Sequence, residues 1–236
     1  METQFWLERW QNSEIGFHQT DVNAHLQDYW ERLRAPSDSL VFVPLCGRTR
    51  DMTWLRAQGY RILGVELSSI AVRDFYAENG LQAKVDAHPP FERWEADRVT
   101  LLRGDLFDLT AGDLEDVVAV YDRAALGAFP PDMRQRYVRK LVAILPPSVQ
   151  ILLVTMDYAQ DAMSGPPFAV SEQEVQALFG PEYRIDHLRT RDVLAENARF
   201  QKRGLKQLVE HVFHIRRGDR ANRERVGDDA SEEPDR

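Results

Sequence analysis

A strand, a tight turn, a helix and a second strand follow one another over residues 41–66, and this unit constrains the fold more than any other part of the chain. The first strand is a continuous apolar run, which is typical of a strand buried on both faces of a sheet. The second strand ends on Glu66. A strand that leads into a helix N-terminus forms a binding place for a nucleotide-like ligand. A carboxylate about 20 residues further on is placed to accept hydrogen bonds from ribose hydroxyls.

The turn between the first strand and the helix reads Pro44-Leu45-Cys46-Gly47 and departs from the G-x-G-x-x-G pattern of dinucleotide sites. Leu45 is bulky where a pyrophosphate needs bare backbone, so the turn indicates a nucleoside cofactor without a diphosphate. S-adenosyl-L-methionine is the obvious candidate. Gly47 permits close backbone approach to the methionine end of that cofactor, and Leu45 supplies main-chain atoms and a wall. Cys46 is expected to be a small buried apolar residue rather than a nucleophile.

The rest of the chain alternates between strand and helix patterns. Residues 3–34 have apolar spacings of three and four and are expected to be mostly helical, with an irregular loop at 12–18. Predicted strands and helices then alternate, and the strands are expected at 40–45, 61–66, 98–103, 116–121 and 149–156. Ser68 and Ser171 are expected to cap helices. Two further strands, 183–191 and 205–215, have no predicted helix between them and should pair antiparallel.

This order predicts an α/β fold. It describes the Rossmann-like, seven-stranded sheet of class I S-adenosylmethionine-dependent methyltransferases, with a C-terminal antiparallel hairpin, whereas plain dinucleotide folds have six parallel strands. We expect a single domain over residues 1–216, with an N-terminal helical cover at 1–38. Residues 217–236 carry many charges and few apolar side chains, which predicts a disordered tail.

Composition restricts the class of partner. The net charge of -8 argues against a general nucleic-acid binder. The single cysteine excludes an intramolecular disulfide and fits a reducing compartment. We see neither a signal peptide nor an apolar stretch of about 20 residues that would span a bilayer. A cytoplasmic protein without a membrane partner is therefore expected.

Six motifs in register resemble the thiopurine S-methyltransferase family, and bacterial members look most similar. The first spans Trp6–Gln19 and includes Trp6-Leu-Glu-Arg-Trp10 and Phe17-His18-Gln19. The other five are Val43-Pro-Leu-Cys-Gly47, Gly64-Val-Glu-Leu-Ser68, Gly104-Asp-Leu-Phe-Asp-Leu109, Tyr121-Asp-Arg-Ala-Ala-Leu126 and Gly165-Pro-Pro-Phe168. The resemblance implies a cytosolic monomer that transfers a methyl group from S-adenosyl-L-methionine to the sulfur of a small aromatic or heterocyclic thiol such as 6-mercaptopurine. Bacterial members are also associated with methylation of selenium and tellurium species.

The resemblance also implies roles for particular residues. Trp10, Leu45, Glu66 and Arg123 fall on the family's cofactor-binding positions, and Arg123 is also expected to position the substrate thiolate. Arg199 roughly matches a second substrate arginine of the family, although the gap lengths differ.

For several other residues the sequence allows either a functional or a structural role. Trp10 and Phe17 flank the irregular N-terminal loop, where an aromatic ring could cover the cofactor and attract its sulfonium or contact the substrate. Trp6 is expected to pack in the core instead. Asp105 with Leu106 sits where this fold meets adenine, and the alternative for Asp105 is a turn cap.

Three other interpretations of the sequence compete with this one. His211 and His214 lie three apart on a predicted strand and would point to opposite faces, so no metal site is predicted. An NAD-dependent oxidoreductase on a similar sheet is disfavoured by the missing glycine pattern and by the terminal hairpin. A non-catalytic nucleoside-binding protein of the same fold is the other alternative.

Overall fold

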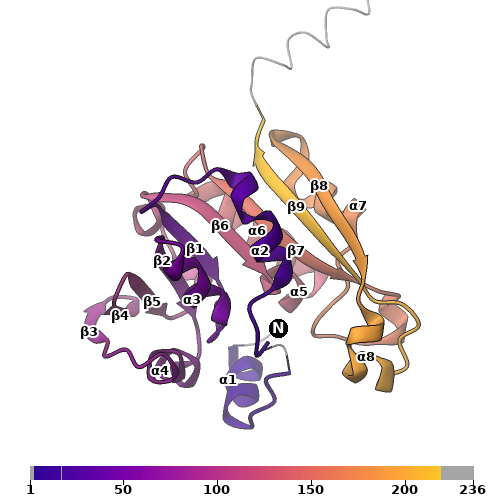
Figure 1. Ribbon diagram of the computed structural model, residues 1–236, viewed down its shortest axis with the longest axis horizontal. Coiled ribbons are helices and arrows are strands. Elements are labelled where there is room, and N and C mark those ends of the chain that lie inside the picture. The colour runs from indigo at the N-terminus through magenta and orange to yellow at the C-terminus, as the bar shows by residue number, and fades with distance from the viewer. Residues whose placement is uncertain (1–2, 17, 219–236) are drawn as a thin grey trace, which may run out of the picture.

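The computed structural model describes residues 3–16 and 18–218, which form a central sheet with helices on both faces (Figure 1). The sheet has nine strands in the order β3-β4-β5-β2-β1-β6-β7-β9-β8. Their bounds are β1 Leu40–Pro44, β2 Arg61–Glu66, β3 Lys84–His88, β4 Phe91–Ala96, β5 Val99–Arg103, β6 Val117–Arg123, β7 Gln150–Asp157, β8 Tyr183–Asp192 and β9 Val209–Arg217.

The five strands β5, β2, β1, β6 and β7 are parallel, and β9 pairs antiparallel with both β7 and β8. The α/β class, the five parallel strands and the antiparallel C-terminal pair are therefore confirmed. The carboxyl ends of β1 and β2 lie side by side, because Pro44 is in register with Val65. The next strand brings Arg103 of β5 opposite Glu66.

Helices cover the two faces of the sheet in two groups. The group formed by α2 (Ala24–Tyr29), α3 (Arg50–Ala57) and α4 (Ser69–Glu78) packs on the face that contains Val41 and Val43. The group formed by α5 (Ala125–Ala128), α6 (Pro131–Ile144) and α7 (Glu172–Phe179) packs on the face that contains Phe42. Successive side chains of β1 thus enter opposite cores, which is why this strand is apolar throughout.

The N-terminal segment forms helix α1 (Thr3–Gln11), a loop, and then α2, as the apolar spacing predicted. Two predicted helix caps are also confirmed. The Ser68 hydroxyl accepts a hydrogen bond from the backbone N–H of Ala71 at 3.3 Å, and the Ser171 hydroxyl accepts one from Glu174 N–H at 3.2 Å. Each cap is local in the sequence, which is why both helix starts could be recognised from the sequence alone.

The expected count of seven strands is wrong, since β3 and β4 add an antiparallel hairpin beside β5. Every residue of β3 is exposed, and in β4 only Phe91 is buried. The hairpin therefore lacks the apolar pattern by which the other strands were recognised. It is held to the sheet by backbone pairing from Glu92 opposite Arg103 to Ala96 opposite Val99.

The connection between β8 and β9 also differs from the prediction. It contains a short helix, α8 (Ala198–Lys202), and β9 starts at Val209 rather than Leu205. At the other end β9 continues to Arg217, and all but the first two residues of the predicted tail lie outside the described residues. Within the described part of the chain no helix is long and apolar enough to cross a membrane.

Candidate active site

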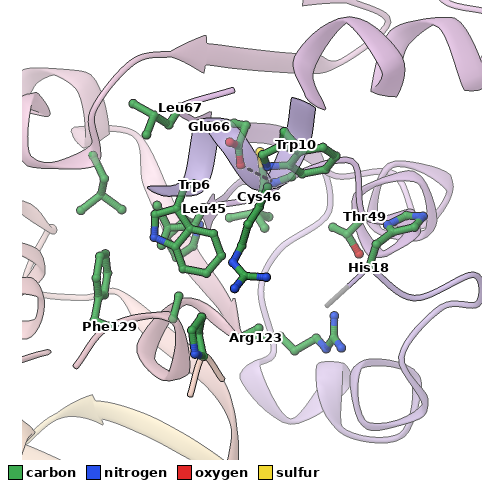
Figure 2. A pocket seen from close by; sticks show the side chains of 18 of the residues that line it. Trp6, Trp10, His18, Leu45, Cys46, Thr49, Glu66, Leu67, Arg123 and Phe129 are labelled. Atoms are coloured by element: carbon green, nitrogen blue, oxygen red, sulfur yellow. Dashed lines mark hydrogen bonds between the residues drawn. The ribbon is translucent and has the colours of Figure 1, made fainter. Parts of the chain in front are cut away.

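A cavity of about 600 Å³ opens at the carboxyl ends of β1, β2, β5 and β6, under helix α1 (Figure 2). Open parallel sheets bind their ligands at this edge. Most of the site residues predicted from the sequence line this cavity: Trp10, Leu45, Gly47, Glu66, Asp105, Leu106, Arg123 and Arg199. Phe17 lies outside the described residues.

The turn from β1 into α3 is compact and has two residues with positive φ, Leu45 at 44° and Gly47 at 52°. The backbone N–H of Cys46 donates to the carbonyl of Val65 at 3.1 Å, which fixes the turn to the end of β2. A Cβ on Gly47 would lie 3.3 Å from the Trp10 ring. Glycine is therefore needed here both for its backbone conformation and for the close approach of Trp10.

Glu66 ends β2 with its carboxylate buried and directed at this turn; the residue is only 7% exposed. One carboxylate oxygen accepts the N–H of Gly47 at 2.9 Å and the other accepts the N–H of Ser68 at 2.8 Å. Burial raises the pKa of this carboxyl, and the surrounding backbone N–H groups oppose the shift. Each oxygen has a second lone pair, so Glu66 can hold the turn and still accept hydrogen bonds from a ligand.

Cys46 is buried beside Glu66, as expected of a small apolar residue. Burial raises the pKa of its thiol well above the usual range, with the Glu66 charge as a second cause. A Cβ on Gly64 would lie 2.7 Å from the Cys46 sulfur, so the thiol packs tightly on bare backbone of β2. A protonated, enclosed thiol is poorly suited to act as a nucleophile.

The segment after β5 forms another wall of the cavity. The Asp105 carboxylate accepts the N–H of Phe107 at 2.9 Å, so it does cap the turn that follows the strand. Phe107 and Phe129 line the wall with their rings 5.8 Å apart, and the guanidinium of Arg136 lies 4.0 Å above the Phe107 ring. The result is an aromatic surface with a polar edge, which suits a flat nitrogen heterocycle.

Helix α1 and the loop after it form the roof of the cavity. Trp10 is buried against Gly47, whereas Trp6, one turn earlier, is half-buried and lines the cavity. The expectation that Trp6 packs in the core is therefore wrong. Arg9 also lines the cavity and is held by Glu14 at 3.2 Å.

Two predicted arginines reach the cavity from distant parts of the chain. Arg123 ends β6, and among residues 3–16 and 18–218 its guanidinium forms neither a hydrogen bond nor an ion pair. Arg199 lies on α8, and its guanidinium packs directly against Gly16 of the N-terminal loop. A Cβ on Gly16 would fall only 1.7 Å from a guanidinium nitrogen of Arg199. Burial, together with the charges of Arg203 and Arg9, lowers the pKa of Arg199. A fixed cation with few counter-charges favours an anionic or electron-rich ligand group.

Several residues that line the cavity received no individual role from the sequence, among them Arg9, His18, Met133, Arg136, Pro166 and Pro167. The two prolines follow Gly165 in a loop after β7, where the Tyr158 hydroxyl donates to the Pro167 carbonyl at 2.6 Å. His211 and His214 lie away from the cavity and form separate hydrogen bonds, to Thr190 and to Gln150.

The model of the family described as thiopurine S-methyltransferase matches residues 1–218. The chain belongs to this family. A curated relative, the thiopurine S-methyltransferase of Nitrosospira multiformis, is 51% identical over 213 residues, which make up 90% of this chain and 97% of the relative. Membership of the family gives no support to the NAD-dependent oxidoreductase or to the non-catalytic nucleoside-binding protein.

Solved structures agree with the family at the level of the fold. A methyltransferase from Anabaena variabilis, described as S-adenosylmethionine-dependent, superimposes with a TM-score of 0.64 at 13% identity, over 92% of this chain and 95% of that one. A second such methyltransferase, from Geobacter sulfurreducens in complex with S-adenosyl-L-homocysteine, gives a TM-score of 0.59 at 16% identity, over 90% of this chain and 98% of that one. The nine-stranded sheet is thus a class I methyltransferase sheet with one additional hairpin.

Proposed function

We propose that this chain transfers a methyl group from S-adenosyl-L-methionine to the sulfur of aromatic and heterocyclic thiols of the thiopurine type. The observation that carries the proposal is the Glu66 carboxylate, held by the N–H groups of Gly47 and Ser68 at the edge of a cavity of about 600 Å³. That volume is within the range of small-molecule sites. Family membership supplies the reaction type.

The residues of the cavity fit the proposed cofactor part by part. Glu66 would accept the ribose hydroxyls, and the open backbone of Leu45–Gly47 would adjoin the methionine end. The wall from Asp105 to Phe129 would take the adenine between aromatic rings. Trp10, buried beside Gly47, would lie near the sulfonium, and aromatic rings attract cations. When bound, the cofactor supplies an electrophilic methyl group on a sulfonium.

The chain itself contributes position and exclusion of water rather than a covalent intermediate. A sulfur lone pair attacks in line, so the main requirement is to hold the acceptor sulfur at the methyl group in a dry site. Trp6, Pro166 and Pro167 provide apolar walls beside the cofactor residues. Arg123 and Arg199 add positive charge, which favours a thiolate over a thiol. Phe17 stays a sequence-based candidate for contact with the substrate.

The setting of the reaction is part of the proposal. We expect a monomer in the cytoplasm that acts on a small molecule and not on nucleic acid. The net charge of -8 supports the last point, because nucleic-acid surfaces repel an acidic protein.

The proposal is tested by incubating the purified protein with S-adenosyl-L-methionine and a panel of aromatic and heterocyclic thiols, and by measuring S-adenosyl-L-homocysteine and the methylated thiol. Calorimetric titration with S-adenosyl-L-homocysteine and, separately, with NADH identifies the ligand. We expect binding of the first ligand only and a thioether product. Binding of NADH, or cofactor binding without transfer to any thiol of the panel, would overturn the proposal.

A further inference from the structure

His18 differs from the other five histidines of the chain. Each of those five has a ring nitrogen in a hydrogen bond: His25 with Glu210, His88 with Asp113, His187 and His211 with Thr190, and His214 with Gln150. Within the described residues the His18 ring has no such partner. His18 is also the one histidine among them that lines the candidate active site. A polar ring of this kind, facing a cavity, is available to a ligand.

A backbone hydrogen bond helps to set the position of His18. It lies between α1 and α2, and its backbone N–H donates to the carbonyl of Ile15 at 2.8 Å. The side chain is half-buried and stands on the wall to which Thr49 and Arg123 also contribute (Figure 2). The imidazole therefore shares one cavity with the arginine proposed to hold the thiolate.

The charges around His18 favour the neutral ring. Burial lowers its pKa from the ordinary value, and the guanidinium groups of Arg48, Arg123 and Arg50 lower it further, while Glu78 acts in the opposite direction. A lowered pKa keeps the imidazole unprotonated at neutral pH, with one ring nitrogen able to accept a proton. Of these, Arg123 also lines the cavity and would stabilise a thiolate formed there.

Acceptor thiols differ in what they need from the protein. Heteroaromatic thiols ionise near neutral pH and so enter the site as thiolates. Alkyl thiols resemble cysteine, which ionises near pH 8.5, and so reach the site mainly as S–H. In a dry cavity that proton requires a local acceptor.

We propose that His18 is a general base for acceptor thiols that are not ionised at neutral pH, an inference that rests on the proposed methyl transfer. The imidazole nitrogen takes the S–H proton, and the sulfur lone pair forms the new S–CH₃ bond. The bond between the methyl group and the sulfonium breaks, and its electron pair stays on the departing thioether. The imidazolium then loses its proton to solvent, so no other co-reactant is needed.

The test compares His18→Asn and His18→Gln with the unmodified protein on two probes, 4-nitrothiophenol, which is ionised at neutral pH, and benzyl mercaptan, which is not. We expect kcat/KM for benzyl mercaptan to fall on the order of 10²–10⁴-fold, the usual contribution of a general base, and kcat/KM for 4-nitrothiophenol to fall by a far smaller factor, because that thiol needs no base. With benzyl mercaptan the unmodified enzyme should lose activity as pH falls through the His18 pKa, below about 6.5. Both variants should lack this acid limb.

Two further measurements separate this role from a structural one. The dissociation constant of S-adenosyl-L-homocysteine should be the same in both variants as in the unmodified protein, and His88→Asn, on the exposed hairpin, should leave all parameters unchanged. Equal losses on the two thiols, weaker cofactor binding, or an acid limb that persists in the variants would overturn the assignment. Failure of the unmodified protein to methylate 4-nitrothiophenol would count against the proposed function instead.

Discussion

Replacing Glu66 with glutamine tests whether one carboxylate serves both the turn and the cofactor. The substitution keeps the size of the side chain but exchanges one oxygen for an NH₂ group. Because each carboxylate oxygen accepts one backbone N–H, from Gly47 or from Ser68, the amide can satisfy only one of them. The other N–H is left buried beside a second donor.

The substitution should lower both the stability of the protein and its affinity for the cofactor. A buried donor without an acceptor costs about 1–3 kcal/mol, so the free energy of unfolding should fall by that amount. Hydrogen bonds from ribose to a charged acceptor are worth about 1.5–3 kcal/mol, so the dissociation constant of the cofactor should rise about 10- to 150-fold. Glu66→Ala removes both acceptors and should lower the free energy of unfolding by about 2–6 kcal/mol.

Urea unfolding measures the first effect, and calorimetric titration with S-adenosyl-L-homocysteine measures the second. Glu95→Gln makes the same change at an exposed position of β4, where the carboxylate contacts Arg93, and serves as the control. If Glu66→Gln bound S-adenosyl-L-homocysteine as tightly as the unmodified protein, the assignment of Glu66 to the ribose would be refuted. If its unfolding matched that of the control, the two backbone hydrogen bonds would not carry the stability ascribed to them.

Three further predictions concern single side chains. Gly47→Ala should weaken cofactor binding, because it places a Cβ 3.3 Å from the Trp10 ring at a φ of 52°; calorimetry checks this, and unchanged affinity would refute it. Gly16→Ala should raise KM for the acceptor with little change in cofactor affinity, since its Cβ would displace the Arg199 guanidinium. Steady-state kinetics with each substrate varied in turn measures both values. A raised KM for the cofactor with an unchanged KM for the acceptor would show that Arg199 serves the cofactor instead. Burial raises the pKa of Asp122 from 3.8 to about 6. Between these two pH values the carboxyl is protonated in the folded state and ionised in the unfolded state. The free energy of unfolding therefore falls as pH rises through this window, by about 3 kcal/mol in all. Asp122→Asn lacks this titration, so its free energy of unfolding in urea, relative to that of the unmodified protein, should increase from pH 4 to pH 7. A difference between the two proteins that does not change with pH would contradict this.

The parts of the fold that the sequence predicted are those with local signals. β1 and β2 are short apolar runs, Ser68 and Ser171 begin their helices through contacts three residues away, and the turn at Gly47 lies directly between predicted elements. The hairpin β3–β4 has no such signal, because its exposed polar side chains reveal nothing of the backbone pairing that holds it to β5.

The same distinction applies to the site. Glu66 and Gly47 were found because strand, turn and carboxylate are contiguous in the sequence. Trp6 and His18 were missed because their role depends on how α1 and its loop lie over the sheet, which is set by contacts such as Trp10 on Gly47. Arg199 was found only through the resemblance, since α8 reaches the cavity from the far end of the chain.

The added hairpin also determines what the two edges of the sheet present to other molecules. Without it β5 would be an edge strand, and its buried apolar residues would offer unpaired backbone groups to any extended peptide. With it the edge is β3, which carries Lys84, Asp86 and His88 and is exposed throughout. The opposite edge, β8, has Arg184, Asp186, Arg189 and Arg191 along its length. A second copy that extended the sheet at either side would have to desolvate these charges, so the molecule resists edge-to-edge aggregation at both ends.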